Sequence, residues 1–326
     1  MKKFLGLILA LSIIALMAVI LLKPETYVSS AAEGLKLWAL VVVPSLLPFF
    51  FFTTMLSKIG VTKRIAKVFD KPCEKIFGTN GISAYVFLMS VLSGYPVGAK
   101  IIGDLGENGL ISDVEATKMS TFCSTSGPLF IIGSVGVGMF GSVKTGRVIF
   151  LSHILSAIIT GLIFRFYRPK KLISSRVAPS VSVISSRNEE KSANVLYDCA
   201  YSSVISLAVV GGFICVFYLV ADVFQNLNLL YPLVFLMNAI TKNADVSNAF
   251  CYGLIECTRG CKMLSLCRLS TYSPAFASAI ISFGGLSVIV QSLCFLKKAN
   301  AKTSVFLLAK LVQTILAFAV CLLFCL

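Results

Sequence analysis

The feature that most constrains the fold of this chain is a series of apolar runs, each about as long as a bilayer is thick. A hydrocarbon core about 30 Å thick is crossed by roughly 20 helical residues, and within it each helix pairs its own backbone polar groups. The runs therefore predict an all-α helix bundle that passes through the membrane several times. They are Phe4–Leu22, Leu37–Leu56, Ile82–Ile102, Met119–Phe140, Val148–Tyr167, Val204–Phe224, Leu229–Ile255, Tyr272–Leu296 and Val305–Leu326.

Composition supports a membrane protein rather than a soluble one. Hydrophobic residues make up 57% of the chain and charged residues only 13%, against about 25% charged residues in a typical soluble domain. The net charge of +15 comes from 29 Lys and Arg against 14 Asp and Glu. These basic residues fall in short loops between apolar runs, where they hold loops on the cytoplasmic side. We therefore expect the lipid bilayer as a partner and no nucleic acid.

The loop charges also orient the bundle. Lys58–Lys75 and Arg165–Lys191 are both rich in Lys and Arg, so both should be cytoplasmic. An even number of crossings must then separate them, but three apolar segments lie between them. The segment that fails to cross is expected to be Ser126–Phe140, because Gly and Pro interrupt it. Irregular backbone at membrane depth survives where it is buried in protein or lines a cavity, so this segment predicts a re-entrant hairpin.

An internal repeat supports this interpretation. Ser126–Phe164 can be placed over Phe283–Cys321 without gaps, at a shift of 157 residues, so that Gly-interrupted segments, basic turns and apolar helices coincide. With a cytoplasmic linker between them, the halves have opposite orientations, and inverted repeats with broken helices are typical of secondary transporters. We predict two inverted-topology repeats with Gly-interrupted re-entrant hairpins at 124–140 and 283–296. The expected domains are an N-terminal transmembrane helix at 1–24, repeats at 35–167 and 196–326, and a cytoplasmic linker at 168–195.

The richest motif is SGYPVGAK at residues 93–100, which is followed by Asp104. Pro96 removes a helix hydrogen bond and Gly94 loosens the same turn. Ionisable residues next to such a break, here Lys100 and Asp104, are candidates for a functional site. The alternative is a close helix contact through the two glycines, with both charges reaching the membrane interface.

Three further segments carry polar groups at membrane depth. Ser124, Thr125 and Ser126 precede Gly127 and Pro128, and free amides there can hold an anion or a polar ligand, unless the hydroxyls only cap a helix. Glu256 ends an apolar helix and either lines a site or pairs with Arg259 at the surface. Gly284 and Gly285 break the second hairpin, followed by Ser287 and Gln291.

Metal and enzymatic chemistry are not expected. Cys257, Cys261 and Cys267 cluster in one region, but zinc sites usually show paired C-x2-4-C units or histidines, and the one histidine, His153, is far away in the sequence. His153 is expected to be a neutral buried residue rather than a proton relay. No phosphate-binding loop, zinc-protease motif or serine-hydrolase motif occurs. We predict no enzyme activity, no metal and no cofactor.

Several of these segments together resemble one family. SGYPVGAK (93–100), TSGPLFIIGSVGVGMF (125–140), GLIECTRG (253–260) and FGGLSVIVQ (283–291) are similar to the sporulation integral membrane protein family YlbJ of endospore-forming Firmicutes, with its Gate, or nucleoside recognition, domain. The resemblance runs from about residue 35 to the C-terminus. It implies a role in spore formation around cortex assembly.

The sequence thus predicts a multi-pass protein of the cell membrane, a transporter-like permease of a small solute, nucleoside or ion, in endospore formation. The alternative is a non-transporting scaffold for sporulation membrane proteins, or a homo-oligomer. The expected site residues are Gly94, Tyr95, Pro96, Lys100, Asp104, Ser124, Thr125, Ser126, Gly127, Glu256, Gly284, Gly285, Ser287 and Gln291.

Overall fold

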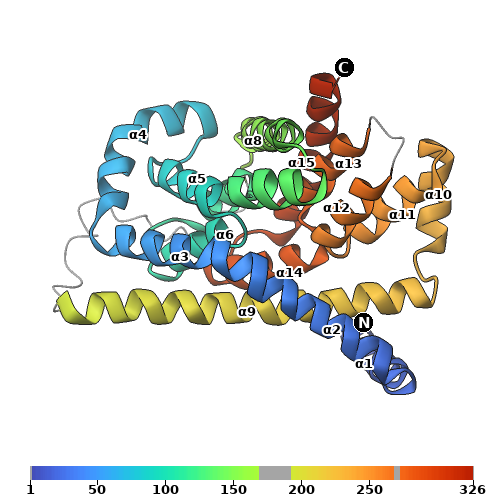
Figure 1. Ribbon diagram of the computed structural model, residues 1–326. Helices are drawn as coiled ribbons and strands as arrows, with labels where there is room; N and C mark the ends of the chain where they lie inside the picture. The colour runs from blue at the N-terminus through green and yellow to red at the C-terminus, as the bar shows by residue number, and fades with distance from the viewer. Residues whose placement is uncertain (1, 169–191, 268–271, 326) are drawn as a thin grey trace.

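The computed structural model describes residues 2–168, 192–267 and 272–325, and every regular element within these ranges is a helix (Figure 1). The all-α fold class is therefore confirmed. Most of the expected linker, 168–195, lies outside the described residues, and α9 already begins at Ser192.

The first half of the chain is built from helices of very different lengths. Its elements are α1 (Lys2–Leu22), α2 (Pro24–Leu37), the π-helical turn η1 (Trp38–Val42), α3 (Val43–Lys58), α4 (Val61–Phe77), α5 (Ile82–Ser93), α6 (Val97–Glu107), α7 (Asp113–Phe122), the π-helix η2 (Leu129–Met139) and α8 (Val143–Phe164). Local sequence sets several boundaries. Ser112 and Glu115 form a capping box that starts α7, and the Ser142 hydroxyl accepts the amide of Thr145 at the start of α8.

The second half follows the same order. Its elements are α9 (Ser192–Asn226), α10 (Tyr231–Thr241), α11 (Ala244–Gly253), α12 (Cys257–Leu266), α13 (Ser273–Phe283), α14 (Gly285–Leu296), the 3₁₀ turn η4 (Lys297–Ala299) and α15 (Thr303–Cys325). Apart from the extra turn η4, the helices α9 to α15 can be set against the elements α3 to α8 in chain order, with α14 in the place of η2. That these halves form a repeat stays a prediction. That the halves are inverted relative to one another stays a prediction, as do the domain limits.

Four stretches of the described residues are long and apolar enough to cross a membrane: Val143–Phe164, Val195–Asn226, Ser273–Ala299 and Thr303–Cys325. Two bent pairs of helices raise the number to six if each pair is one span: α1 with α2, bent by 106°, and α4 with α5, bent by 88°. The chain is therefore a multi-pass membrane protein.

The two segments expected to be re-entrant behave differently. η2 has 11 residues, too few to cross a bilayer alone, as the sequence predicted. The break at Gly284 instead lies inside Ser273–Ala299, which is long enough to cross as one span. A re-entrant course for 283–296 stays a prediction.

The long helices frame the broken ones. α8 and α15 pack on each other and on α13, while α9 runs along one side of the bundle against α2 and α3 (Figure 1). One buried apolar cluster joins α5, α7 and α15 through Tyr85, Met119 and Phe306. Another joins α8 and α13 through Ile149 and Ile280. This packing brings the helix breaks of both halves together in the centre of the molecule.

Candidate functional site

Two helix breaks of the first half touch each other. α5 ends at Ser93, Gly94 has a φ of +82°, and α6 begins at Val97. A Cβ atom on Gly94 would lie 2.7 Å from the backbone nitrogen of Gly127, in the break between α7 and η2. Gly94 is therefore required both for its backbone conformation and for this close approach.

The two breaks of the second half are joined by backbone hydrogen bonds. The amide of Leu286 donates to the carbonyl of Leu254 at 2.8 Å, and the amide of Ser287 donates to the carbonyl of Ile255 at 3.3 Å. Gly284 and Gly285, at the start of α14, both have positive φ. Backbone groups freed by one interruption are thus satisfied by the other, which is what a low-dielectric interior demands.

His153, in the middle of α8, connects the two halves. Its Nε2 accepts the amide of Ser126 at 2.9 Å, and its Nδ1 lies 2.8 Å from the hydroxyl of Ser282 in α13. A nitrogen that accepts an N–H carries no proton, so the proton is on Nδ1 and the imidazole is neutral. The structure agrees with the neutral buried histidine expected from the sequence, since His153 is fully buried.

These contacts overturn one expectation. The amide of Thr125 donates to the hydroxyl of Ser90 at 3.1 Å, and the amide of Ser126 donates to His153. Neither amide is free to hold an anion. The prediction of anion binding by these two groups was wrong, because side chains from α5 and α8, distant in sequence, already satisfy both.

All four breaks meet at one cavity of about 80 Å³. Apolar side chains from η1, α3 and α9 close one side of it, among them Leu46, Phe49 and Val210. The breaks supply the polar lining: Ser93, Tyr95, Ser126, Glu256, Thr258, Ser287 and Gln291. Among residues 2–168, 192–267 and 272–325, the buried hydroxyl of Ser93 has no hydrogen-bond partner, and the amide of Gln291 donates to Ser287 at 3.1 Å.

Glu256 supplies the one carboxylate among the lining residues. It is the N-cap of α12, where its side chain accepts the backbone amides of Thr258 at 3.2 Å and Arg259 at 2.7 Å. With a relative exposure of 3%, it does not form a surface pair with Arg259. A carboxylate at a helix N-terminus is stabilised by the helix dipole, so Glu256 can be held at this depth.

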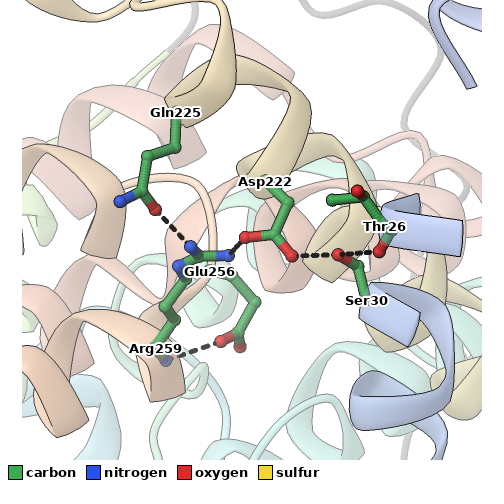
Figure 2. Close-up of polar contacts among 6 residues, drawn as sticks. All are labelled: Thr26, Ser30, Asp222, Gln225, Glu256 and Arg259. Carbon is green, nitrogen blue, oxygen red and sulfur yellow. Dashed lines mark hydrogen bonds and ion pairs between the residues drawn. The ribbon is translucent and has the colours of Figure 1, made fainter. Parts of the chain in front are cut away.

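The guanidinium group of Arg259 instead binds α9, as Figure 2 shows. It donates to the carboxylate of Asp222 and to the side-chain oxygen of Gln225. The hydroxyl of Ser30 in α2 contacts the other oxygen of Asp222. This cluster, here the α2–α9–α12 cluster, anchors the first turn of α12, and hence Glu256, to the two helices beside it.

The structure separates the expected site residues into two groups. Seven line the cavity: Gly94, Tyr95, Ser126, Gly127, Glu256, Ser287 and Gln291. The other seven do not: Pro96, Lys100, Asp104, Ser124, Thr125, Gly284 and Gly285. Lys100 points instead toward α9, where its ammonium donates to the hydroxyl of Ser202 at 3.0 Å.

Sequence reasoning missed some polar groups of this region. Ser93 and Thr258 line the cavity but lie in motifs whose other residues seemed more informative. Lys310 faces His153 across the repeat, at the shift of 157 residues, but it is not among the expected site residues. The sequence does carry a signal for it, since a lysine in the middle of an apolar span is a candidate functional residue by default.

Comparisons with known proteins agree with this architecture. The Gate family, described as nucleoside recognition, matches residues 39–145, a range that contains both breaks of the first half. The chain is also 30% identical over 338 residues to the sporulation integral membrane protein YlbJ of Bacillus subtilis (strain 168), covering 97% of this chain and 82% of that protein. No solved structure matches the chain significantly.

Proposed function

Because this chain belongs to the YlbJ family of sporulation integral membrane proteins, we propose that it is a permease of the cell membrane in endospore formation, at the stage of the spore cortex. It moves a small polar solute through the cavity at the four helix breaks. The family and the multi-pass architecture are the premise of this proposal; the solute and its movement are the inference.

The observation that carries the proposal is the convergence of the four breaks on one cavity. Interrupted helices lose backbone hydrogen bonds, and in a membrane this loss is tolerated where the backbone is buried in protein or lines a cavity. Transporters place their substrate sites at such interruptions near the bilayer midplane. A chain that served only as a membrane anchor would not need four helix breaks that meet at one cavity.

The lining restricts the class of solute. Within the described part of the chain, the lining contains the carboxylate of Glu256 and several hydroxyl and amide groups, but no Lys, Arg or His. This charge balance favours a neutral or cationic solute over an anion. The cavity of about 80 Å³ is far below the roughly 300–1,000 Å³ of pockets that hold drug-sized ligands. In this conformation the site is thus better suited to a solute smaller than a nucleoside.

The test is solute flux in proteoliposomes containing the full chain, with small neutral, cationic and anionic solutes compared. We expect flux of a neutral or cationic solute. Glu256→Gln removes a charged hydrogen-bond acceptor, a loss of about 1.5–3 kcal/mol, so flux should fall by about tenfold or more. The control is Lys302→Ala, at an exposed side chain, which should leave flux unchanged. Equal flux in the Glu256→Gln and wild-type proteins would exclude this site.

A second function, a non-transporting scaffold, is favoured by one observation. Several polar groups of the lining are already satisfied internally: Glu256 by two amides, and Gln291 by Ser287. A scaffold would hold other sporulation membrane proteins, or a second copy of the chain, without a ligand. Thermal unfolding screened against nucleosides, metals and small anions separates the two functions, since a ligand that binds the folded state raises its stability. A scaffold predicts no stabilisation by any of them.

A further inference from the structure

Lys310 lies in the middle of α15 with a relative exposure of 1%. The nitrogen of its ammonium group, which carries three N–H donors, lies within hydrogen-bond distance of four oxygen atoms: the carbonyls of Ser124 at 2.6 Å and Ser282 at 3.3 Å, the side-chain oxygen of Gln313 at 3.2 Å, and the hydroxyl of Tyr95 at 3.2 Å. All four acceptors are neutral groups. A buried ammonium is costly unless it is well hydrogen-bonded, so this shell of oxygens is what holds it.

The position of the two carbonyls explains how they compensate a positive charge. Ser124 comes directly after the C-terminal end of α7, and Ser282 lies in the last turn of α13. The C-terminal end of a helix carries a partial negative charge of roughly half an elementary charge. The ammonium of Lys310 therefore lies between the negative ends of two interrupted helices, one from each half of the chain.

The neighbouring titratable groups do not supply a counter-charge. His153, on α8, is neutral because its Nε2 accepts the amide of Ser126. Tyr95 donates its hydroxyl to the carbonyl of Ile281 at 3.1 Å, so it is in its neutral form as well. The site is thus an oxygen cage in which the one positive charge belongs to the chain itself.

In secondary transporters, unwound carbonyls and the C-terminal ends of half-helices coordinate the coupling sodium ion or proton. We propose that the ammonium group of Lys310 occupies that place as a built-in cation, so that the protein has no need of a sodium ion. This inference rests on the proposed function for its meaning in transport, but it makes a claim about cation binding that can be measured without any transported solute.

The experiment is thermal unfolding of the purified full chain in detergent, with equimolar sodium, potassium, methylammonium or N-methyl-D-glucamine chloride. We expect the same Tm for the wild-type protein in all four salts. Lys310→Ala leaves the carbonyls of Ser124 and Ser282 facing an empty, cation-sized site. Its Tm should be lower in N-methyl-D-glucamine chloride and rise by about 3 °C or more in a small cation that fills this site. Lys302→Ala, at an exposed side chain, should behave like the wild type.

Two results would overturn the proposal. One is a sodium-selective rise in Tm of the wild-type protein, which would show that a separate sodium site exists; it needs no variant and decides the matter even where Lys310→Ala does not fold. The other is a folded Lys310→Ala protein that is indifferent to the cation. Failure of the proposed function would look different, because absence of flux for every solute would leave these cation effects as described.

Discussion

The close approach of α6 to the break after α7 can be tested by comparing two glycine-to-alanine variants. A Cβ atom on Gly98, in α6, would lie 1.7 Å from the carbonyl oxygen of Cys123, whereas real Cβ atoms essentially never approach another heavy atom closer than 3.0 Å, so the two backbones must move apart. Overpacking of this kind costs about 1–3 kcal/mol. At Gly212, in α9, no described residue places a heavy atom within 4 Å of the same position, the backbone of α9 itself left aside, and alanine there gains about 0.5–1 kcal/mol from helix propensity.

The two variants should therefore change stability in opposite directions. Gly98→Ala should lower the free energy of unfolding by about 1–2 kcal/mol after the propensity gain is subtracted, whereas Gly212→Ala should raise it slightly. Thermal unfolding can be followed through Trp38, the one tryptophan of the chain, whose indole donates to the carbonyl of Leu207 in α9. If Gly98→Ala were as stable as Gly212→Ala, the contact between α6 and this break, and with it the geometry of the cavity, would be refuted.

Three further predictions concern charged groups. In a double-mutant cycle of Arg259→Met and Asp222→Asn, whose side chains are 15% and 21% exposed, we expect a coupling energy of about 1–2 kcal/mol in chemical unfolding; strict additivity would argue against the α2–α9–α12 cluster. Glu256→Ala should lower the free energy of unfolding by about 1 kcal/mol through loss of the α12 cap, measured in the same way. An unchanged stability would show that Glu256 does not stabilise α12 as its cap. Lys298→Ala breaks an exposed ion pair with Glu107 at 2.9 Å, and the free energy of unfolding should stay within about 0.5 kcal/mol of the wild-type value. A larger loss would show that this pair stabilises the fold in spite of its exposure.

Local sequence was enough to place the helix breaks. Pro96 cannot continue a membrane helix without loss of a hydrogen bond, and Gly94 readily adopts the positive φ that ends α5. The structure interrupts the chain between Ser93 and Val97. Gly284 likewise ends α13 with a left-handed backbone. The positions of these breaks depend on the conformational preferences of single residues, and those residues can be read from the sequence without knowledge of the packing.

Which side chains face the cavity was harder to predict. Successive residues of a helix point about 100° apart, so one turn beyond a break the direction of a side chain depends on how that helix packs. Lys100 lies in α6 and turns to Ser202 of α9, whereas Ser93, before the break, lines the cavity.

The contacts between the two halves were equally hidden. The shift of 157 residues pairs His153 with Lys310, but only the packed structure shows that both reach Ser282. Hydrogen bonds between residues that are far apart in the sequence leave no local pattern. For the same reason the amides of Thr125 and Ser126 seemed free in the sequence.

The central claim, that the breaks enclose a site open to water and solutes, is tested most directly by cysteine accessibility. In a chain whose 11 native cysteines are replaced, Ser287→Cys places a thiol in the cavity lining. Ser278→Cys places one in α13, fully buried and outside that lining. A small, membrane-impermeant thiol reagent should label position 287 and leave 278 unlabelled. Protection of both positions from the reagent, applied from either side of the membrane, would contradict the account.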